Sequence, residues 1–160
     1  MKKLRTLLIL CVLIAGTAAV GAPAGAEPLL KQGSRGDYVW DLQYRLKTID
    51  LFDQELTGYF GEHTRQAVVK FQKKYGLQAD GIVGPATWKA LRKYTLNKSE
   101  MDIMARIIHG EARGEPYKGQ VAVGAVVMNR IRSNQFPDTI RGVVFQPGAF
   151  TAVSDGQYWL

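Results

Sequence analysis

A carboxylate on the apolar face of a predicted helix is the feature of this 160-residue sequence that points most directly to chemistry. Between Ser99 and Pro116, apolar residues recur at helical spacing, at Met101, Met104, Ala105, Ile107 and Ile108. The same stripe, continued by one turn, reaches Glu111. Because burial disfavours the charged form of a carboxyl group, a Glu packed beside aliphatic side chains can donate a proton near neutral pH. Glu111 is therefore the candidate catalytic residue.

The two ends of this predicted helix carry their own signals. Ser99 is the predicted N-cap, and Gly110 marks the place where the helix should fray or stop. A Glu-Arg-Gly sequence at a helix end is also typical of a solvated turn, in which Glu111 would form an ion pair with Arg106 or Arg113. Spacing alone leaves both interpretations open.

Other kinds of active site fit the sequence less well. His109, Glu111 and Glu115 together resemble a metal-binding group, but zinc enzymes need more imidazole or thiolate ligands than this chain offers. The only other histidine, His63, belongs to a different segment, and the only cysteine, Cys11, lies near the N-terminus. The sequence has no G-x-S-x-G motif and no phosphate-binding glycine motif. No metal or cofactor is expected, which leaves glycan cleavage by a carboxyl group.

The N-terminus is predicted to be a secretory signal peptide over residues 1–26. Lys2, Lys3 and Arg5 precede an apolar run over 7–15, and small residues at 24–26 form a cleavage site. A retained N-terminal anchor is the alternative interpretation. Removal of the signal peptide would lower the formal net charge from +7 to +4. A mildly basic exported protein suits an anionic polymer such as cell wall, whereas the absence of a dense Lys/Arg stripe counts against nucleic acid.

Residues 27–94 form a compact unit with an internal repeat. The segment 58–67 matches the segment 81–90 position for position, at a constant offset of 23 residues. Each copy is a glycine-containing turn that leads into a helix. The helix after the first copy has an apolar stripe over 67–75 and is closed by Gly76, and a second stripe over 39–49 predicts one further helix upstream. The prediction is a three-helix bundle.

The remaining chain is divided into a linker over 95–98 and a region over 99–160 that holds Glu111. In this region, the stretch 120–132 is apolar almost all round, which predicts a helix covered on every side. Further along, the short apolar runs 140–145 and 150–153 are interpreted as a helix and a strand. The chain then stops on the apolar residues Tyr158-Trp159-Leu160.

The unit over 27–94 resembles the type 1 peptidoglycan-binding domain. The resemblance rests on the segments QGSRGDYVWDLQYRL, GYFGEHTRQAVVKFQKKYGL and DGIVGPATWKAL. It implies a domain that binds bacterial cell wall and carries no chemistry itself, with most of the matching apolar residues in the core. Tyr59, Asp80 and Gln43 are the candidate substrate-binding residues.

The segment ARIIHGEARGEPYKGQVAVGAVVMNRI resembles the opening of the catalytic domain of the spore cortex-lytic (SleB-type) cell wall hydrolases. In that family the Glu of the G-E-A-R-G-E motif is the catalytic acid, and here it is Glu111. The implied fold is mainly α, with a lysozyme-like α+β catalytic region behind the helical bundle. Members of the family continue well beyond Leu160, so region 99–160 is expected to be a truncated, incomplete catalytic region. Part of its apolar surface is expected to be exposed.

The expected activity follows from Glu111 standing alone, since Glu115, Asp138 and Asp155 make no obvious partner for it. A lytic transglycosylase can use a single acid, because the 6-hydroxyl of muramic acid closes the ring and no activated water is needed. The resemblance implies this reaction on spore cortex at germination, in the region of the cortex and inner spore membrane or in the extracellular wall. Peptidoglycan is the expected partner, beside a membrane- or coat-associated helper protein. The rival hypothesis is a wall-binding protein without catalysis.

Overall fold

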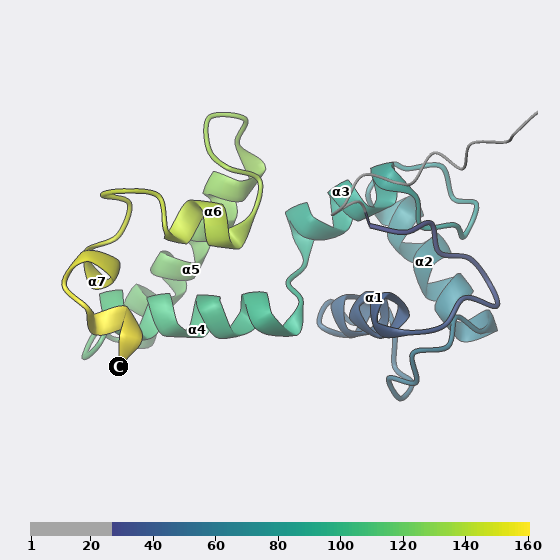
Figure 1. Ribbon diagram of the computed structural model, residues 1–160, viewed down its shortest axis with the longest axis horizontal. Helices are drawn as coiled ribbons and strands as arrows, with labels where there is room; N and C mark the ends of the chain where they lie inside the picture. The colour runs from purple at the N-terminus through teal and green to yellow at the C-terminus, as the bar shows by residue number, and fades with distance from the viewer. Residues whose placement is uncertain (1–26) are drawn as a thin grey trace, which may run out of the picture.

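The computed structural model describes residues 27–160, so the signal peptide predicted over 1–26 lies outside the described residues. Two groups of helices follow one another and are joined by one short connection (Figure 1). The first group is α1 (Asp37–Lys47), α2 (Glu62–Lys74) and α3 (Pro85–Tyr94). The second is α4 (Lys98–Glu111), α5 (Tyr117–Arg132), α6 (Ile140–Val144), α7 (Thr151–Ser154) and the 3-10 helix η1 (Gln157–Trp159). The mainly helical fold is confirmed.

β-structure within residues 27–160 is limited to two isolated bridges, Leu30 with Val83 and Arg35 with Tyr59. The strand predicted over 150–153 is therefore wrong, because residues 151–154 form the helix α7. Among the same described residues, none of the helices combines the length and the apolarity that crossing a membrane requires.

The first group is the predicted three-helix bundle. Its helices enclose an apolar core whose largest fully buried members are Phe60, Phe71, Trp88, Leu42 and Leu46. The helices start where the sequence predicts them: α2 follows Gly61, and α3 follows Gly84 with a proline in its first turn. Proline suits that position because its fixed φ matches the helix and its missing N–H is not needed there.

The second group is built around α4, which packs against α5, α6, α7 and η1. Its core comprises Leu96, Met104, Ile107, Val127, Ile131, Ile140, Val143, Val144, Ala152 and Tyr158. The prediction of Ser99 as the N-cap of α4 is wrong. Asn97 accepts a hydrogen bond from the Glu100 backbone N–H at 2.7 Å, and the Glu100 side chain accepts one from the Asn97 N–H at 2.8 Å. This reciprocal capping box starts the helix at Lys98.

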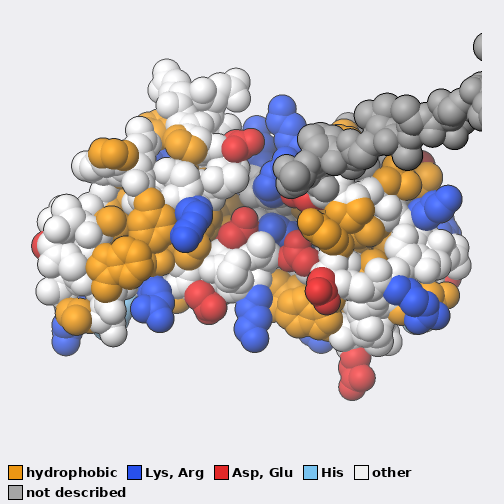
Figure 2. All heavy atoms as spheres, viewed as in Figure 1, with side chains coloured by type: hydrophobic (Ala, Val, Ile, Leu, Met, Phe, Trp, Pro, Cys, Tyr) orange, Lys and Arg blue, Asp and Glu red, His pale blue; other side chains and the backbone are white. Residues whose placement is uncertain are grey.

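Helix α5 contradicts the prediction that it is covered on every side. Only Val127 and Ile131 are buried, while Val121 and Val126 are 49% and 43% exposed. Gly124 faces α4: a Cβ at this position would lie 3.3 Å from the Ile108 Cδ1 atom. One side of α5 therefore packs closely on α4, while Val121 and Val126 leave apolar surface of the same helix exposed. Hydrophobic side chains also gather on the face of this group drawn in Figure 2.

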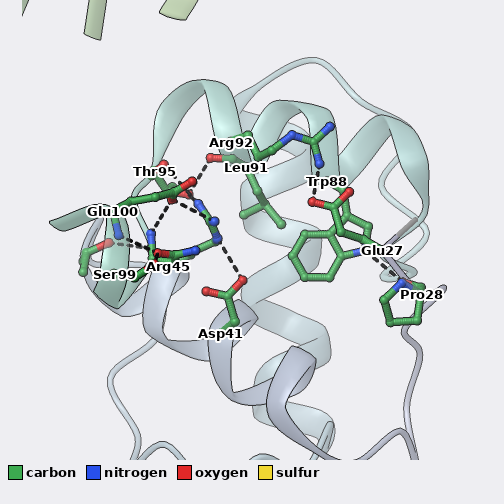
Figure 3. Close-up of polar contacts among 12 residues, drawn as sticks. Glu27, Pro28, Asp41, Arg45, Trp88, Leu91, Arg92, Thr95, Ser99 and Glu100 are labelled. Atoms are coloured by element: carbon green, nitrogen blue, oxygen red, sulfur yellow. Dashed lines mark hydrogen bonds and ion pairs between the residues drawn. The ribbon is translucent and has the colours of Figure 1, made fainter. Parts of the chain in front are cut away.

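The connection between the two groups is packed around the buried side chain of Arg45 (Figure 3). Its guanidinium pairs with Asp41 at 3.1 Å and with Glu100 at 2.9 Å, and it donates to the Thr95 carbonyl oxygen at 3.2 Å. Arg45 and Asp41 belong to α1, Thr95 to the connection, and Glu100 to the first turn of α4. We call these four residues the Arg45 network. It ties the first group to the helix that carries Glu111.

Candidate active site

Glu111 is the last residue of α4, and its side chain is half-buried. One of its carboxylate oxygens, Oε1, accepts a hydrogen bond of 2.6 Å from the backbone N–H of Ala152 in α7. The N-cap of α7, Phe150, offers no side-chain oxygen to the free N–H groups of that helix. Glu111 fills this role from a distance of 41 residues in the sequence.

Gly110 allows α4 and α7 to approach so closely. A Cβ atom at this position would lie 2.6 Å from the Cβ of Ala152 and 3.5 Å from the Gln157 backbone. Atoms cannot come that near without displacement, so the contact requires glycine. The prediction that the helix stops near Gly110 agrees with the structure to within one residue, because α4 ends at Glu111 and Ala112 is the C-cap. The sequence gives no signal of this contact, because its two sides are far apart along the chain.

The second carboxylate oxygen of Glu111, Oε2, makes no hydrogen bond to residues 27–160. The carboxylate is thus held through one of its two oxygens by a backbone donor. The sequence predicts aliphatic side chains beside Glu111, and the structure adds a polar N–H as its hydrogen-bond partner. A backbone N–H forms a stronger hydrogen bond with an ionised carboxylate oxygen than it forms with a neutral acceptor.

Glu111 stands apart from other charged groups of the described chain. Neither Arg106 nor Arg113 forms an ion pair with it within residues 27–160, so the alternative of a simple ion-paired turn is not observed there. The other carboxylates considered from the sequence, at Glu115, Asp138 and Asp155, are exposed. In the same range no three His, Cys, Asp or Glu side chains lie close enough together to hold a metal ion.

Two hollows flank the C-terminal half of α4. One of about 330 Å³ is lined by Ala105, Ile108, His109, Ala112, Arg113, Gly114 and Gln120. The other, of about 580 Å³, is lined by Asp102, Ala105, Arg106, His109, Gln157, Tyr158 and Leu160. Ala105 and His109 line both hollows, so this part of α4 lies between them. Glu111 lines neither hollow, although its neighbour Ala112 does.

Gln43, a predicted substrate-binding residue, is buried inside the first group. Its amide nitrogen donates to the Tyr59 carbonyl oxygen at 2.9 Å and to the Thr64 hydroxyl at 3.0 Å. Its amide oxygen accepts from the Gly58 N–H at 3.0 Å. With both ends of the amide occupied, Gln43 holds the turn before α2 in place. Its substrate-binding role stays a prediction, and the structure gives it a positioning role.

The second copy of the repeat is held in the same way by Gln72. Its amide nitrogen donates to the Ile82 carbonyl oxygen at 2.9 Å and to the Thr87 hydroxyl at 3.2 Å, and its oxygen accepts from the Gly81 N–H at 2.9 Å. The three partners lie 23 residues after those of Gln43. The sequence repeat is therefore a repeat of turns, each fastened by a glutamine from the preceding helix.

Tyr59, another predicted substrate-binding residue, lies in the first copy of the repeat, and Asp80, the third, directly precedes the second copy. Asp80 is exposed, and its carboxylate accepts hydrogen bonds from the Ile82 N–H at 2.9 Å and the Gln72 amide at 3.0 Å. The pKa of Asp80 lies below its ordinary value. The largest cause is the hydrogen bond from the Ile82 N–H, and the next is the hydrogen bond from the Gln72 amide. Tyr59 is 40% exposed, and the Arg35 guanidinium lies 4.1 Å from its ring centroid.

A hollow of about 340 Å³ in the first group brings two of these three residues together. It is lined by Gln43, Phe52, Gln54, Glu55, Thr57, Tyr59, Gly61, Glu62, His63 and Thr64. Gln43 and Tyr59 therefore lie at one hollow, and Asp80 is not among its lining residues. Of the two, only Tyr59 exposes a substantial part of its side chain to a ligand.

Comparison with known proteins agrees with this two-part architecture. The family model described as a cell wall hydrolase matches residues 114–160, a range that begins three residues after Glu111, and the one described as a putative peptidoglycan binding domain matches residues 35–91. The class is thus a cell wall hydrolase region preceded by a peptidoglycan-binding domain. The spore cortex-lytic enzyme of Bacillus cereus is 33% identical over 189 residues, which cover 94% of this chain and 73% of the relative. The chain belongs to the spore cortex-lytic enzyme family.

Two further proteins are similar to this chain. The spore cortex-lytic enzyme of Oceanobacillus iheyensis is also 33% identical, over 192 residues that cover 86% of this chain and 70% of the relative. Among solved structures, the catalytic domain of the Bacillus cereus SleB protein is 55% identical over 40% of this chain, with a TM-score of 0.38. The match covers 50% of that catalytic-domain structure.

Proposed function

We propose that this protein is an exported enzyme that degrades spore cortex peptidoglycan at germination, as a lytic transglycosylase with Glu111 as its acid and base. The observation that carries the proposal is the asymmetric carboxylate of Glu111. Its Oε1 atom is fixed by the Ala152 N–H, and its Oε2 atom has no partner within residues 27–160. Membership in the spore cortex-lytic enzyme family supports the substrate, and the peptidoglycan-binding domain supports the location at the wall.

The proposed reaction needs one carboxyl group and no water. Protonated Oε2 of Glu111 donates its proton to the oxygen of the bond between N-acetylmuramic acid and N-acetylglucosamine, and the bond from C1 to that oxygen breaks. The 6-hydroxyl of the same muramic acid then attacks C1, and its proton passes to the Glu111 carboxylate. The products are a 1,6-anhydromuramic end and a free N-acetylglucosamine hydroxyl, and Glu111 regains its proton.

In the proposed cycle, the Ala152 N–H has a supporting part. Glu111 alternates between a neutral acid and a carboxylate, and the N–H donor stabilises the carboxylate when it forms. It also fixes the plane of the group, so that the same oxygen can give and receive the proton. Orientation of this kind matters for catalysis, because small displacements of a reacting group lower the rate strongly.

The test is the substitution Glu111→Gln, with Glu115→Gln as the matched control. Glutamine keeps the size of the side chain and an oxygen for the Ala152 N–H, but it has no proton to donate. The rate of cortex solubilisation should fall by about 10²–10⁴-fold in Glu111→Gln, while Glu115→Gln keeps the parent rate. Muropeptide analysis of the parent digest should show anhydro ends. A Glu111→Gln variant with the parent rate would contradict the assignment, and reducing ends would indicate a hydrolytic muramidase.

A non-catalytic wall-binding protein is the second candidate function. It is favoured by the position of Glu111, which lines neither of the two hollows beside α4. The same experiment separates the two candidates. Under this alternative, the parent and the Glu111→Gln variant would bind peptidoglycan equally well, and neither would release any muropeptide.

A further inference from the structure

We propose that the cleft between α3 and the C-terminal end of α5 is a binding site for anionic groups carried by the wall polymer, either carboxylate or phosphate. The cleft has a volume of about 400 Å³, and its charged lining residues are Lys89, Arg92, Lys93, Arg132 and Asp138. The proposal deepens the proposed function, on which its ligand class rests. It assigns a second contact with the wall, separate from Tyr59 and from Glu111.

The charge balance of the cleft is strongly positive. Four cationic side chains face one carboxylate, that of Asp138. Arg92 is neutralised by an ion pair with Glu27. Lys89, Lys93 and Arg132 form no ion pair within residues 27–160, which leaves a surplus of positive charge. Cations that line one hollow raise the local concentration of anions and attract them from solution.

A cation from each wall of the cleft lies near the ring of Tyr94. The Arg132 guanidinium, at the end of α5, lies 5.6 Å from the ring centroid of Tyr94. The Lys93 ammonium, in α3, lies 5.9 Å from the same centroid. An aromatic ring attracts cations without neutralising them, so Tyr94 holds both groups near the cleft and leaves their charge available to a ligand. Lysine and arginine side chains gather between the two helical groups in Figure 2.

The cleft is preformed, because contacts between the two helical groups hold its walls in place. One wall belongs to the first helical group and the other to the second, and α3 packs against α5. The Arg45 network fastens the connection that leads from α3 to α4 (Figure 3). A preformed site binds more tightly than one that must be assembled, because less conformational freedom is lost on binding.

The ligand chemistry is that of an anionic polymer rather than of a neutral sugar. Peptidoglycan stem peptides carry carboxylates, and teichoic acids attached to the wall carry phosphates. Both accept charge-assisted hydrogen bonds from lysine and arginine. Because the cleft is lined by both helical groups, an anion bound there contacts the peptidoglycan-binding domain and the region of Glu111 at once.

The test compares two double charge reversals in the full chain. Lys89→Glu/Arg132→Glu changes the cleft, and Lys31→Glu/Lys70→Glu makes the same change of net charge at exposed positions outside it. Co-sedimentation is measured on three probes: purified peptidoglycan with its teichoic acid, the same material without teichoic acid, and the latter with its stem-peptide carboxylates amidated. The cleft variant should bind the anionic probes about tenfold or more weakly than the control variant, since two charge-assisted contacts are lost.

The three probes identify the source of the anion. If parent binding falls only on amidation, the cleft takes stem-peptide carboxylates; if it falls on removal of teichoic acid, the cleft takes phosphates. A neutral pair, Lys89→Gln/Arg132→Gln, repeats the measurement should the charge reversal fail to fold, as judged by circular dichroism. Equal binding by the cleft and control variants on all probes would overturn the proposal. Release of muropeptides by the cleft variant in that case would leave the proposed function standing.

Discussion

Asp80 shows how a single exposed carboxylate can fasten a turn. It occupies the position that Thr57 holds in the first copy of the repeat, 23 residues earlier. The Thr57 hydroxyl accepts a hydrogen bond from the Tyr59 N–H at 3.2 Å, as Asp80 does from the Ile82 N–H at 2.9 Å. The two side chains perform the same task, but only the carboxylate titrates.

This difference predicts a pH dependence of stability. The hydrogen bonds lower the pKa of folded Asp80 below its ordinary value of 3.8. Ionised Asp80 therefore stabilises the fold above that pH, and the contribution is lost as the pH falls through the folded-state pKa. Asp80→Thr, which copies the first repeat, should flatten the dependence of the unfolding free energy on pH between about pH 5 and pH 2. Urea unfolding at several pH values measures it, and the same slope in parent and variant would contradict the prediction.

At the scale of residues, the position of Glu111 at the end of a helix could be predicted from the apolar stripe, but its hydrogen-bond partner could not. The stripe over 101–108 is local information that spacing reveals. The Ala152 N–H comes from a helix 41 residues away, and backbone groups leave no mark in the sequence. The substrate-binding role of Gln43 stays a prediction, and the sequence gives no sign that both ends of its amide bind the turn before α2.

Helix packing at the candidate site depends on the contact between α4 and α7. Gly110→Ala should push α7 away, because the new Cβ would meet the Ala152 Cβ at 2.6 Å. Overpacking of this kind typically destabilises a protein by about 1–3 kcal/mol, and here it also breaks the hydrogen bond from the Ala152 N–H to Glu111. We expect lower stability in thermal unfolding and a lower rate of cortex solubilisation.

The compensating double variant makes this prediction specific. Gly110→Ala/Ala152→Gly moves the methyl group from one side of the contact to the other and restores the space. It should recover part of the lost activity relative to Gly110→Ala alone. Gly84→Ala is the matched control, because a Cβ at Gly84 would meet no atom within 4 Å. If Gly110→Ala behaves like Gly84→Ala, the close approach of the two helices is not needed.

Elements with strong local signals could be predicted, and short ones could not. The helices over 39–49 and 67–75 have complete apolar stripes, and the structure contains α1 and α2 there. Residues 150–153 have no such stripe, and the helix α7 depends on a cap from Glu111, which only the folded chain supplies. The predicted N-cap of α4, Ser99, lies two residues after the observed one, Asn97. Both residue types are good N-caps, but only Asn97 has a Glu three residues later.

The whole molecule is held together by the Arg45 network. The Arg45 side chain is 4% exposed, and its partners Asp41 and Glu100 are 26% and 18% exposed. Burial raises the pKa of Asp41, while the nearby Arg45 acts in the opposite direction. Arg45→Met would leave both carboxylates without their cation. Breaking a buried pair in this way typically costs about 3–5 kcal/mol.

Calorimetry of the full chain tests this prediction. Arg45→Met should lower the unfolding temperature and separate the unfolding of the two helical groups. Arg65→Met is the matched control, because Arg65 forms an exposed ion pair with Glu62, and such pairs are worth under about 1 kcal/mol. If the two variants lose the same small amount of stability, the Arg45 network does not couple the groups.

Because α4 is one continuous helix, it bears on which glycosidic bonds of a glycan strand the protein can cleave. Glu100, anchored to the first helical group, and Glu111 lie on one helix, about 16 Å apart along its axis at 1.5 Å per residue. With a short, packed connection, a protein resting on the wall would reach only bonds at a set spacing from its resting point. On the proposed function, fragment lengths from immobile strands would cluster around preferred values, whereas a loosely tethered enzyme would produce a broad distribution.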